Sequence, residues 1–452
     1  MARQFYSTNS PGSFVDLKEA VLRSLPADNG LYMPEEIPVL GAEFWESWRD
    51  WSFEELGFNI VKPLLDGAVP EEVLREMVAG AINFDAPIVK LNEQEYVLEL
   101  FHGPTLAFKD FGARFMARLM GWLTRDDDRE LTVLVATSGD TGGAVASAFH
   151  GVAGTRVVIL YPRGKVSGLQ EKQLTTLGEN ITALEVEGTF DDCQRMVKSA
   201  FLDRKMSEEL NLTSANSINI ARLIPQMFYY FHAARQLTGG VEPVFVVPSG
   251  NFGNLTAGLL AEKMGLKVKK FIAATNVNDV VPEYLEKGDY RPRPSVGTIS
   301  NAMDVGAPSN FARMQEIFGK MREPMCRRIA GYAFDDDQTR TGIREVKATS
   351  GYAIDPHGSV AYLAAEEWLV ANPGDTTVIL ETAHPSKFLD VMEEELGEGA
   401  VEIPDRLACL AGREKVAIEM GGGEGEFLGG LRGGAGQAPP PSPLIKMMKR
   451  KQ

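Results

Sequence analysis

The chain has 452 residues, of which 44% are apolar and 24% are charged, and its net charge is −16 at pH 7. This length and composition are typical of a soluble globular protein with two or three domains. The acidic balance disfavours a general nucleic-acid binder. Three cysteines without CxxC spacing argue against a disulfide framework and against structural zinc. We therefore expect a reducing, cytoplasmic location, no metal site and no nucleic-acid partner.

A membrane location is also not expected. The first ten residues, MARQFYSTNS, lack the apolar core of a signal peptide. The longest uncharged run, residues 243–261, is interrupted by serine, asparagine and glycine.

The first 90 residues predict a mainly helical N-terminal domain. Amphipathic patterns indicate helices at 16–25 and 42–56, separated by turn signals. Trp45, Trp48 and Trp51 recur every third residue, which favours a core-facing helix stripe over a binding surface. No catalytic constellation is present in this segment.

Residues 91–405 predict a catalytic region made of two α/β subdomains, the smaller at roughly 110–240. Strand patterns occur at 96–100, 131–137, 156–162, 181–188, 243–249, 270–276 and 376–382. Helical runs separate most of them, including 190–202 and 219–237. Apolar strands without alternation predict parallel sheets covered by helices on both faces. Ligands in such sheets collect at the carboxyl ends of the strands.

The C-terminal segment 406–452 predicts a disordered tail. Between residues 421 and 441, nine of 21 residues are glycine and three are proline, and the basic end KMMKRKQ follows. Such a composition buries too little apolar surface to offset the entropy of the chain.

Lys109 is the first candidate for chemistry, because it lies where a loop becomes a helix. A strand pattern at 96–100 precedes it, and Phe111, Phe115 and Met116 recur at helical spacing after it. Unpaired N–H groups at a helix start disfavour a second cation, so an amine partly withdrawn from water loses its proton more easily. A neutral amine can attack a carbonyl. The alternative interpretation is a solvated cation.

Glycine-centred loops after the strands at 131–137, 156–162 and 243–249 could hold a phosphate or a planar ring. None fits a nucleotide motif, since the sequence contains no GxxxxGK[ST] and no GxGxxG after a strand. A lysine combined with such loops indicates pyridoxal 5'-phosphate.

Eight segments of the chain resemble those of the threonine synthases. They are FHGPTLAFKDFGARFM (101–116), ATSGDTGGAVASAF (136–149), LYPRGKVSGLQEKQ (160–173), SANSINIARLIPQ (214–226), VPSGNFGNLTAGLLA (247–261), FIAATNVNDVVP (271–282), SNAMDV (300–305) and ETAHPSKF (381–388). The resemblance runs from about residue 5 to about residue 405, and the tail departs from it. It implies an α/β protein of pyridoxal-phosphate fold type II, which is tryptophan synthase β-like.

The resemblance also implies the cofactor site. Lys109 matches the lysine that carries the cofactor, Thr382 the hydroxyl at the pyridine nitrogen, and Asp140 the residue beside the ring hydroxyl. The phosphate loop matches Gly250, Asn251, Phe252, Gly253 and Asn254. From the loop alone, a simple strand-to-helix turn explains these residues equally well.

Substrate-binding residues are implied in the same way. They are His102, Thr105, Ser138, Gly139, Thr141, Asn216, Ser217, Asn219 and Arg222. Ser138 or Asp140 could instead cap a helix through Phe149, and Arg222 could be an exposed charge. Arg163 and Lys165 are nearby candidates only.

The reaction that the resemblance implies converts O-phospho-L-homoserine and water into L-threonine and phosphate, catalysed by a monomer or a homodimer. One alternative is a related phospho-lyase that releases 2-oxobutyrate. A serine or threonine dehydratase of the same fold is a second, which the SANSINIAR loop disfavours because an unphosphorylated substrate needs no second anion site.

Overall fold

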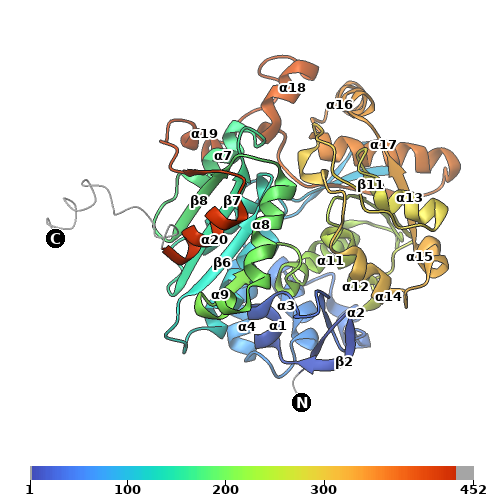
Figure 1. Cartoon of the computed structure of the whole chain (residues 1–452). Helices are drawn as coiled ribbons and strands as arrows, with labels where there is room; N and C mark the ends of the chain where they lie inside the picture. The colour runs from blue at the N-terminus through green and yellow to red at the C-terminus, as the bar shows by residue number, and fades with distance from the viewer. Residues whose placement is uncertain (1–2, 434–452) are drawn as a thin grey trace, which may run out of the picture. The chain divides into compact units, whose positions relative to one another are not determined.

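The computed structural model describes residues 3–433, which fall into two compact units (Figure 1). Unit 1 comprises Met1–Met116 and Ser217–Pro404, and unit 2 comprises Ala117–Asn216 and Asp405–Gln452. Each unit is therefore assembled from two segments that are distant in the sequence. The domain boundaries predicted at residues 90 and 405 stay predictions.

The N-terminal part of unit 1 is mainly helical, as predicted. Its helices are α1 (Leu17–Arg23), α2 (Ala42–Ser47), α3 (Phe53–Val61) and α4 (Glu71–Ala81). The single helix predicted at 42–56 is two helices, because Ser52 caps α3 by accepting a hydrogen bond from the N–H of Glu55 at 3.1 Å. A small antiparallel sheet of β1 (Phe5–Ser7), β2 (Ser10–Val15) and β3 (Tyr32–Pro34), in the order β2-β1-β3, was not predicted.

The tryptophan stripe is only partly confirmed. Trp45 lies in α2, whereas Trp48 and Trp51 follow it. Trp48 is buried and the other two are half-buried, and all three rings pack around Phe44.

Unit 1 is built around a six-stranded sheet of order β12-β11-β10-β13-β5-β4. The strands are β4 (Ile88–Lys90), β5 (Glu95–Glu99), β10 (Val244–Pro248), β11 (Lys270–Thr275), β12 (Ile329–Ala333) and β13 (Thr377–Glu381). All pairs are parallel except β4 with β5.

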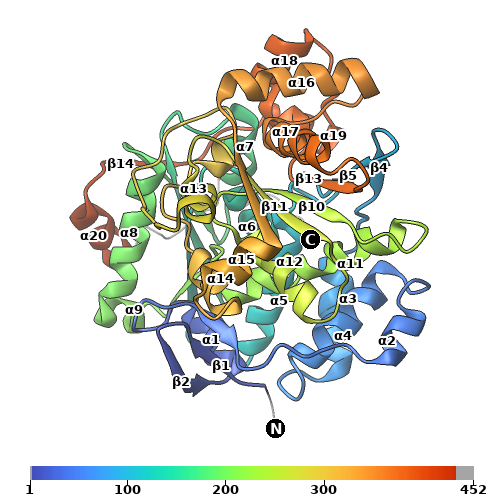
Figure 2. The ribbon, with the colours of Figure 1, turned by 90° about the vertical axis from the view of Figure 1, so that its right-hand side faces the viewer.

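Helices cover both faces of this sheet, as Figure 2 shows for α17 (Pro356–Ala371) and α12 (Gly253–Lys263). Val244 and Val246 share a core with α17. The alternate residue Phe245 meets Tyr230 of α11 (Gln226–Gln236), with ring centroids 4.9 Å apart. Buried parallel strands present apolar side chains to both faces, which explains the continuous apolar runs in the sequence.

Unit 2 contains a wholly parallel five-stranded sheet of order β14-β8-β7-β6-β9. The strands are β6 (Leu131–Ala136), β7 (Thr155–Pro162), β8 (Ile181–Val186), β9 (Leu212–Ser214) and β14 (Ile418–Met420). Figure 1 shows α8 (Phe190–Leu202) and α20 (Glu424–Gly433) over β6, β7 and β8, where they share an apolar core with the sheet.

The remaining helices complete the described part of the chain. They are α5 (Lys109–Leu123), α6 (Asp140–Phe149), α7 (Gly168–Thr175), α9 (Arg204–Glu209), α10 (Ile220–Leu223), α13 (Val280–Lys287), α14 (Phe311–Ile317), α15 (Arg322–Arg328), α16 (Asp336–Ser350), α18 (Leu389–Leu396) and α19 (Asp405–Ala411), with short 3-10 turns η1 (Lys62–Leu64), η2 (Asn301–Met303) and η3 (Pro385–Phe388). The helix predicted at 219–237 is α10 followed by α11, because Pro225 interrupts it.

The tail requires a correction. Residues 405–433 form α19, β14 and α20 rather than a disordered segment. Phe427 and Leu431, one helical turn apart, are buried in the core beneath α8, so two apolar residues outweigh the surrounding glycines. Residues 434–452 lie outside the described part of the chain. Among residues 3–433, no helix has the length and apolarity required to cross a membrane.

Candidate active site

Three predicted loops of unit 1 leave the same edge of its sheet. β10, β13 and β5 are neighbours and run in parallel, so their carboxyl ends meet at one edge. β10 leads into Gly250–Asn254, β13 into Thr382, and β5 into the loop that ends at Lys109.

Hydrogen bonds join the Lys109 segment directly to the Thr382 segment. The N–H of Phe108 donates to the carbonyl of Thr382 at 2.9 Å, and Ala107 and Ala383 form an isolated β-bridge. Thr382 is buried, whereas Lys109 is half-buried with Nζ 4.1 Å from the centroid of the Phe108 ring. The structure therefore brings together the two segments that carry these predicted residues.

Asp110 holds the loop in front of Lys109. Its carboxylate accepts hydrogen bonds from the N–H and the hydroxyl of Thr105, both at 2.8 Å. Gly103 packs so closely on Asp110 that a Cβ would lie 2.5 Å from Oδ2. Asp110 is fully buried, and this burial raises its pKa to about 6 despite the two hydrogen bonds. The Thr105 hydroxyl, predicted to bind substrate, thus has a partner inside the protein.

Two bulky residues in these loops have left-handed backbone conformations. Leu106 precedes Lys109 and Phe252 lies in the predicted phosphate loop, and both have φ of 59°. For residues with a Cβ this conformation costs about 1–2 kcal/mol, and such residues cluster at functional sites.

The predicted phosphate loop follows β10 with little free space. A Cβ on Gly250 would lie 2.8 Å from the carbonyl oxygen of Ala302 and 2.9 Å from Cα of Met303. Asn251 is held by Ser309, whose N–H donates to its Oδ1 at 3.1 Å, and by the N–H of Asn310, which donates to its carbonyl at 3.3 Å.

These residues fit pyridoxal phosphate. Gly250 lets the backbone pass where a side chain would collide, and Gly253 begins α12, whose first N–H groups favour an anion. The Nδ2 atom of Asn254 is buried without a hydrogen-bond partner among residues 3–433, which is unusual for an amide unless a ligand completes it. Lys109 is predicted to supply the amine, and Thr382 is predicted to supply the partner of the ring nitrogen.

The SANSINIAR segment is only partly arranged as the resemblance implies. Ser217 lies beside Gly253, and its hydroxyl accepts a hydrogen bond from Nδ2 of Asn310 at 3.2 Å. Asn219 caps α10 through Oδ1, and its Nδ2 donates to the carbonyl of Val21 at 2.9 Å.

Arg222 is not the exposed charge that the alternative interpretation expects. It is 2% exposed and packs against Gly112 of α5, where a Cβ would lie 2.8 Å from Nε. Burial lowers the pKa of its guanidinium to about 10, and the nearby Asp110 carboxylate opposes that shift. Whether Arg222 contacts substrate stays a prediction.

Unit 2 carries the SGDTG loop after β6. Neither Ser138 nor Asp140 caps α6, so both versions of the capping alternative are wrong. Thr137 takes this role, since its Oγ1 accepts hydrogen bonds from the N–H groups of Gly139 at 2.9 Å and Gly142 at 2.8 Å.

Gln170 of α7 determines the position of Asp140. Its Nε2 donates to Oδ1 of Asp140 at 2.8 Å, and a Cβ on Gly139 would meet the same side chain at 2.6 Å. Asp140 is buried, whereas Ser138 and Thr141 are half-buried.

Asn216, also in unit 2, pairs with the end of β6. Its Nδ2 donates to the carbonyl of Ala136 at 2.7 Å, and its Oδ1 accepts from the same residue's N–H at 3.2 Å. The minor candidates are on the surface of this unit: Arg163 forms an ion pair with Glu419 at 2.6 Å, and Lys165 is exposed.

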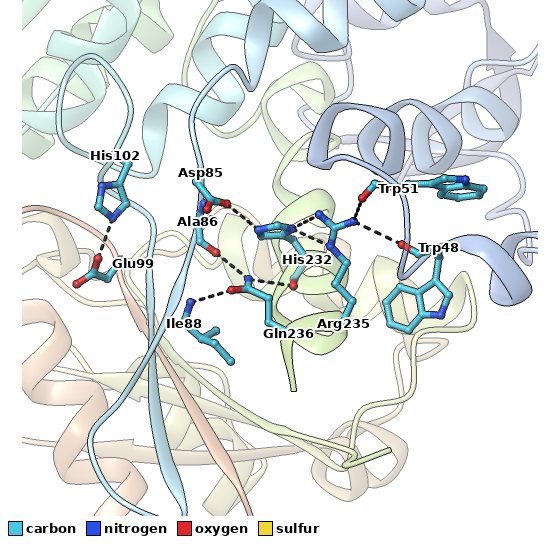
Figure 3. A network of polar contacts seen from close by, with 10 residues as sticks. All are labelled: Trp48, Trp51, Asp85, Ala86, Ile88, Glu99, His102, His232, Arg235 and Gln236. Carbon is cyan, nitrogen blue, oxygen red and sulfur yellow. Dashed lines mark hydrogen bonds and ion pairs between the residues drawn. The ribbon is translucent and has the colours of Figure 1, made fainter. Parts of the chain in front are cut away.

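His102 is paired with a carboxylate. Its Nε2 lies 2.8 Å from Oε2 of Glu99, as Figure 3 shows, and the other oxygen of Glu99 accepts from the Tyr352 hydroxyl at 2.9 Å. His102 remains partly exposed, so its predicted contact with substrate is sterically open.

Sequence reasoning missed several residues that support these loops. They are Asp110, Thr137, Tyr229, Tyr230 and Asn310. Asp110, next to Lys109, could have been predicted from the sequence, because an acidic residue in the first helical turn often reaches back to the preceding loop. The two tyrosines carry no local signal.

Comparisons with known proteins agree on one family. Residues 4–82 match the model of the threonine synthase N terminus, residues 83–382 that of pyridoxal-phosphate dependent enzymes, and residues 359–424 that of the threonine synthase C-terminal region.

Individual relatives cover nearly the whole chain. The threonine synthase of Escherichia coli is 45% identical over 408 residues, which is 90% of this chain and 94% of the relative. Its crystal structure superposes with a TM-score of 0.90 at 42% identity, covering 95% of this chain and 99% of that one. The crystal structure of PLP-bound threonine synthase from Brucella melitensis has a TM-score of 0.87 at 34% identity, covering 95% and 99%.

Proposed function

The chain belongs to the threonine synthase family, and from this premise we propose that Lys109, Thr382 and the loop Gly250–Asn254 form its cofactor site. The reaction itself is that of the family, the pyridoxal-phosphate-dependent conversion of O-phospho-L-homoserine and water into L-threonine and phosphate. The enzyme is thus a carbon–oxygen lyase that acts on phosphates.

Each residue has a defined task in this proposal. When bound, pyridoxal phosphate supplies an electron sink for the negative charge that develops on the substrate carbons. The N–H groups at the start of α12 and Nδ2 of Asn254 hold its phosphate. The Thr382 hydroxyl donates to a neutral ring nitrogen and orients the ring.

Lys109 moves protons in this proposal. It holds the cofactor between turnovers, and its amine then accepts the proton from Cα of the substrate and later returns a proton. An amine serves both steps because it alternates between neutral and charged forms. Asp140, Ser138, Gly139, Thr141 and Asn216 of unit 2 keep their predicted roles as predictions.

The observation that carries the site assignment is the direct pairing of the two segments that bear Lys109 and Thr382. The hydrogen bond between Phe108 and Thr382 and the bridge between Ala107 and Ala383 hold the backbone before Lys109 beside the backbone of Thr382. Such fixing by backbone positions a reacting group more tightly than side-chain contacts alone.

The assignment is tested with the purified chain, pyridoxal phosphate and O-phospho-L-homoserine. Threonine, phosphate and 2-oxobutyrate are quantified for the parent protein, for Lys109→Ala and for Lys165→Ala, which changes an exposed lysine of unit 2. We expect equal amounts of threonine and phosphate from the parent and from Lys165→Ala. Lys109→Ala should lose turnover and the visible absorbance of the bound cofactor. Unchanged absorbance in Lys109→Ala would contradict the assignment of Lys109 as the residue that holds the cofactor.

The proposal also covers the oligomeric state and the cellular location. We propose that the protein acts in the cytoplasm, which the free thiols of Cys193, Cys326 and Cys409 support because a reducing compartment keeps thiols unpaired. We also propose that it acts as a monomer or a homodimer. Sedimentation velocity determines the oligomeric state, and cell fractionation determines the location.

A further inference from the structure

Asn254, at the start of α12, accepts hydrogen bonds from two adjacent tyrosines of α11. The hydroxyls of Tyr229 and Tyr230 each lie 2.7 Å from its Oδ1. Tyr229 is also 3.3 Å from Oε1 of Gln226, and Tyr230 is 3.0 Å from the carbonyl oxygen of Asn254. All of these side chains belong to unit 1, and both tyrosines are fully buried.

The distances determine which way the carboxamide of Asn254 faces. A separation of 2.7 Å is typical of O–H···O bonds, whereas N–H···O bonds centre near about 2.9–3.0 Å. Burial raises the pKa of both phenols well above 10, so each keeps its single proton. The separations of 2.7 Å assign that proton to Oδ1 of Asn254 rather than to the longer contacts at 3.0 and 3.3 Å. The oxygen of the amide therefore faces α11. Because the amide is planar, Nδ2 faces away from the phenols, and it is the buried atom without a partner among residues 3–433.

Helix α11 is a rigid support for this arrangement, because its C-terminal half is anchored by a polar network (Figure 3). Arg235 donates to Nδ1 of His232 at 3.0 Å and also binds the carbonyl of Trp51. Nε2 of His232 lies 2.9 Å from Asp85, and Gln236 donates to the carbonyl of Ala86 at 2.9 Å. The helix cannot rotate about its axis without breaking these contacts.

We propose that Tyr229 and Tyr230 are positioning residues for the cofactor phosphate, because their hydroxyls hold the Asn254 amide with Nδ2 turned toward the phosphate as a donor. Without the two hydroxyls this orientation of the amide loses both hydrogen bonds to Oδ1, so its oxygen can face the phosphate and repel it. This inference rests on the proposed assignment of Gly250–Asn254 to the phosphate.

The test compares two ligands that differ only in the phosphate. The full-length chain, freed of cofactor by dialysis, is titrated with pyridoxal phosphate and with pyridoxal, and the ratio of the two affinities is recorded from the absorbance. The variants are Tyr229→Phe, Tyr230→Phe, the double variant and Asn254→Asp. Tyr284→Phe is the matched control, because this buried tyrosine of α13 packs edge-on against Phe311.

We expect the ratio to fall about threefold in each single variant and about tenfold in the double variant, which corresponds to one lost neutral hydrogen bond in total. Affinity for pyridoxal should stay unchanged, and Tyr284→Phe should match the parent. The phosphorus NMR signal of the bound cofactor should shift in the tyrosine variants but not in the control. The single variants keep both rings, so they provide the answer if the double variant does not fold.

The possible failures are distinguishable. If Asn254→Asp lowers the ratio and the tyrosine variants do not, the phosphate loop stands and the role of the tyrosines is overturned. Equal losses for both ligands would mean general support of the fold, which also overturns the inference. If the parent binds both ligands equally, the assignment of the loop in the proposed function is wrong.

Discussion

The loops that follow β5 in unit 1 and β6 in unit 2 are secured in opposite ways. In unit 1 the tie comes from inside the helix, since Asp110 reaches back to the N–H and hydroxyl of Thr105. In unit 2 it comes from before the helix, since Thr137 reaches forward to the N–H groups of Gly139 and Gly142. The first tie is an ionisable carboxylate and the second is a neutral hydroxyl. Both loops connect a strand to the next helix, but the two ties should contribute different amounts to the free energy of unfolding and should respond differently to pH.

Replacing the carboxylate should have the largest effect. Asp110→Asn places an amide N–H against one of the two donors of Thr105 in a fully buried position, so we expect the free energy of unfolding to fall by about 3 kcal/mol. Urea unfolding followed by tryptophan fluorescence measures it. Asp289→Asn, an exposed carboxylate of unit 1, is the control and should be neutral. A loss no larger than that of the control would show that Asp110 does not secure the loop.

The difference between parent and Asp110→Asn should also depend on pH. The folded pKa of Asp110 is raised to about 6 from an ordinary 3.8, so the folded state binds its proton first. The part of its contribution to stability that is linked to this proton is fully present below pH 3.8 and is lost as the pH rises through 6. The difference between the two proteins should therefore grow by about 2.4 kcal/mol from pH 7 to pH 4. A difference that is constant with pH would contradict the buried carboxyl.

Removing the hydroxyl in unit 2 should have a smaller effect without pH dependence. Thr137→Val leaves the N–H groups of Gly139 and Gly142 without their acceptor, and we expect a loss of about 1–2 kcal/mol at every pH. Thr176→Val is the control, because that hydroxyl bonds only within its own helix turn, to Lys172. Urea titrations between pH 5 and pH 8, roughly the range in which proteins are most stable, measure this loss. If the loss changed with pH as much as that of Asp110→Asn, the predicted difference between the two loops would be wrong.

The smallest effect is expected at Ser167, which supports the SGDTG loop only through Gln170. Ser167 forms a capping box with Gln170, which in turn binds Asp140. Ser167→Ala should lower the free energy of unfolding by about 0.5–1 kcal/mol. Ser199→Ala, on α8, is the control, since its hydroxyl bonds one turn back to Met196. A loss equal to that of Thr137→Val would mean that Ser167, rather than Thr137, is the main support of the loop.

The seven strands β5, β6, β7, β8, β10, β11 and β13 were predicted to within one or two residues, because buried parallel strands are continuous apolar runs. The other four strands of these sheets, β4, β9, β12 and β14, were not predicted. The helix 190–202 was predicted at its observed bounds, where Thr189 provides a capping box. The sheet β1-β2-β3 could not be predicted, because Gly and Pro in SPGSFV are turn signals and the pairing joins Phe5 to Pro34 across the chain. The tail was misjudged because glycine content conceals the spacing of Phe427 and Leu431.

The candidate site divides in the same way. The motifs pointed to the loops, and the structure shows that the segments carrying Lys109 and Thr382 are joined by a backbone hydrogen bond. The roles of the two residues stay predictions. The support behind the loops depends on contacts between distant residues, such as Tyr229 with Asn254, and no local pattern encodes them. Asn219 and Asn216 were predicted to bind substrate, but in the structure their amides also bond to the backbone of Val21 and Ala136.

The division of unit 2 into two segments has a consequence for synthesis on the ribosome. β14 pairs with β8, and α20 packs on α8, although more than two hundred residues separate them in the chain. Until that late segment leaves the ribosome, β8 is an open edge beside an uncovered apolar patch that includes Val158 and Leu184. A nascent or truncated chain that stops before residue 405 therefore presents a surface for chaperones or for aggregation. The edge at β8 is closed only when β14, near the end of the described chain, has been synthesised.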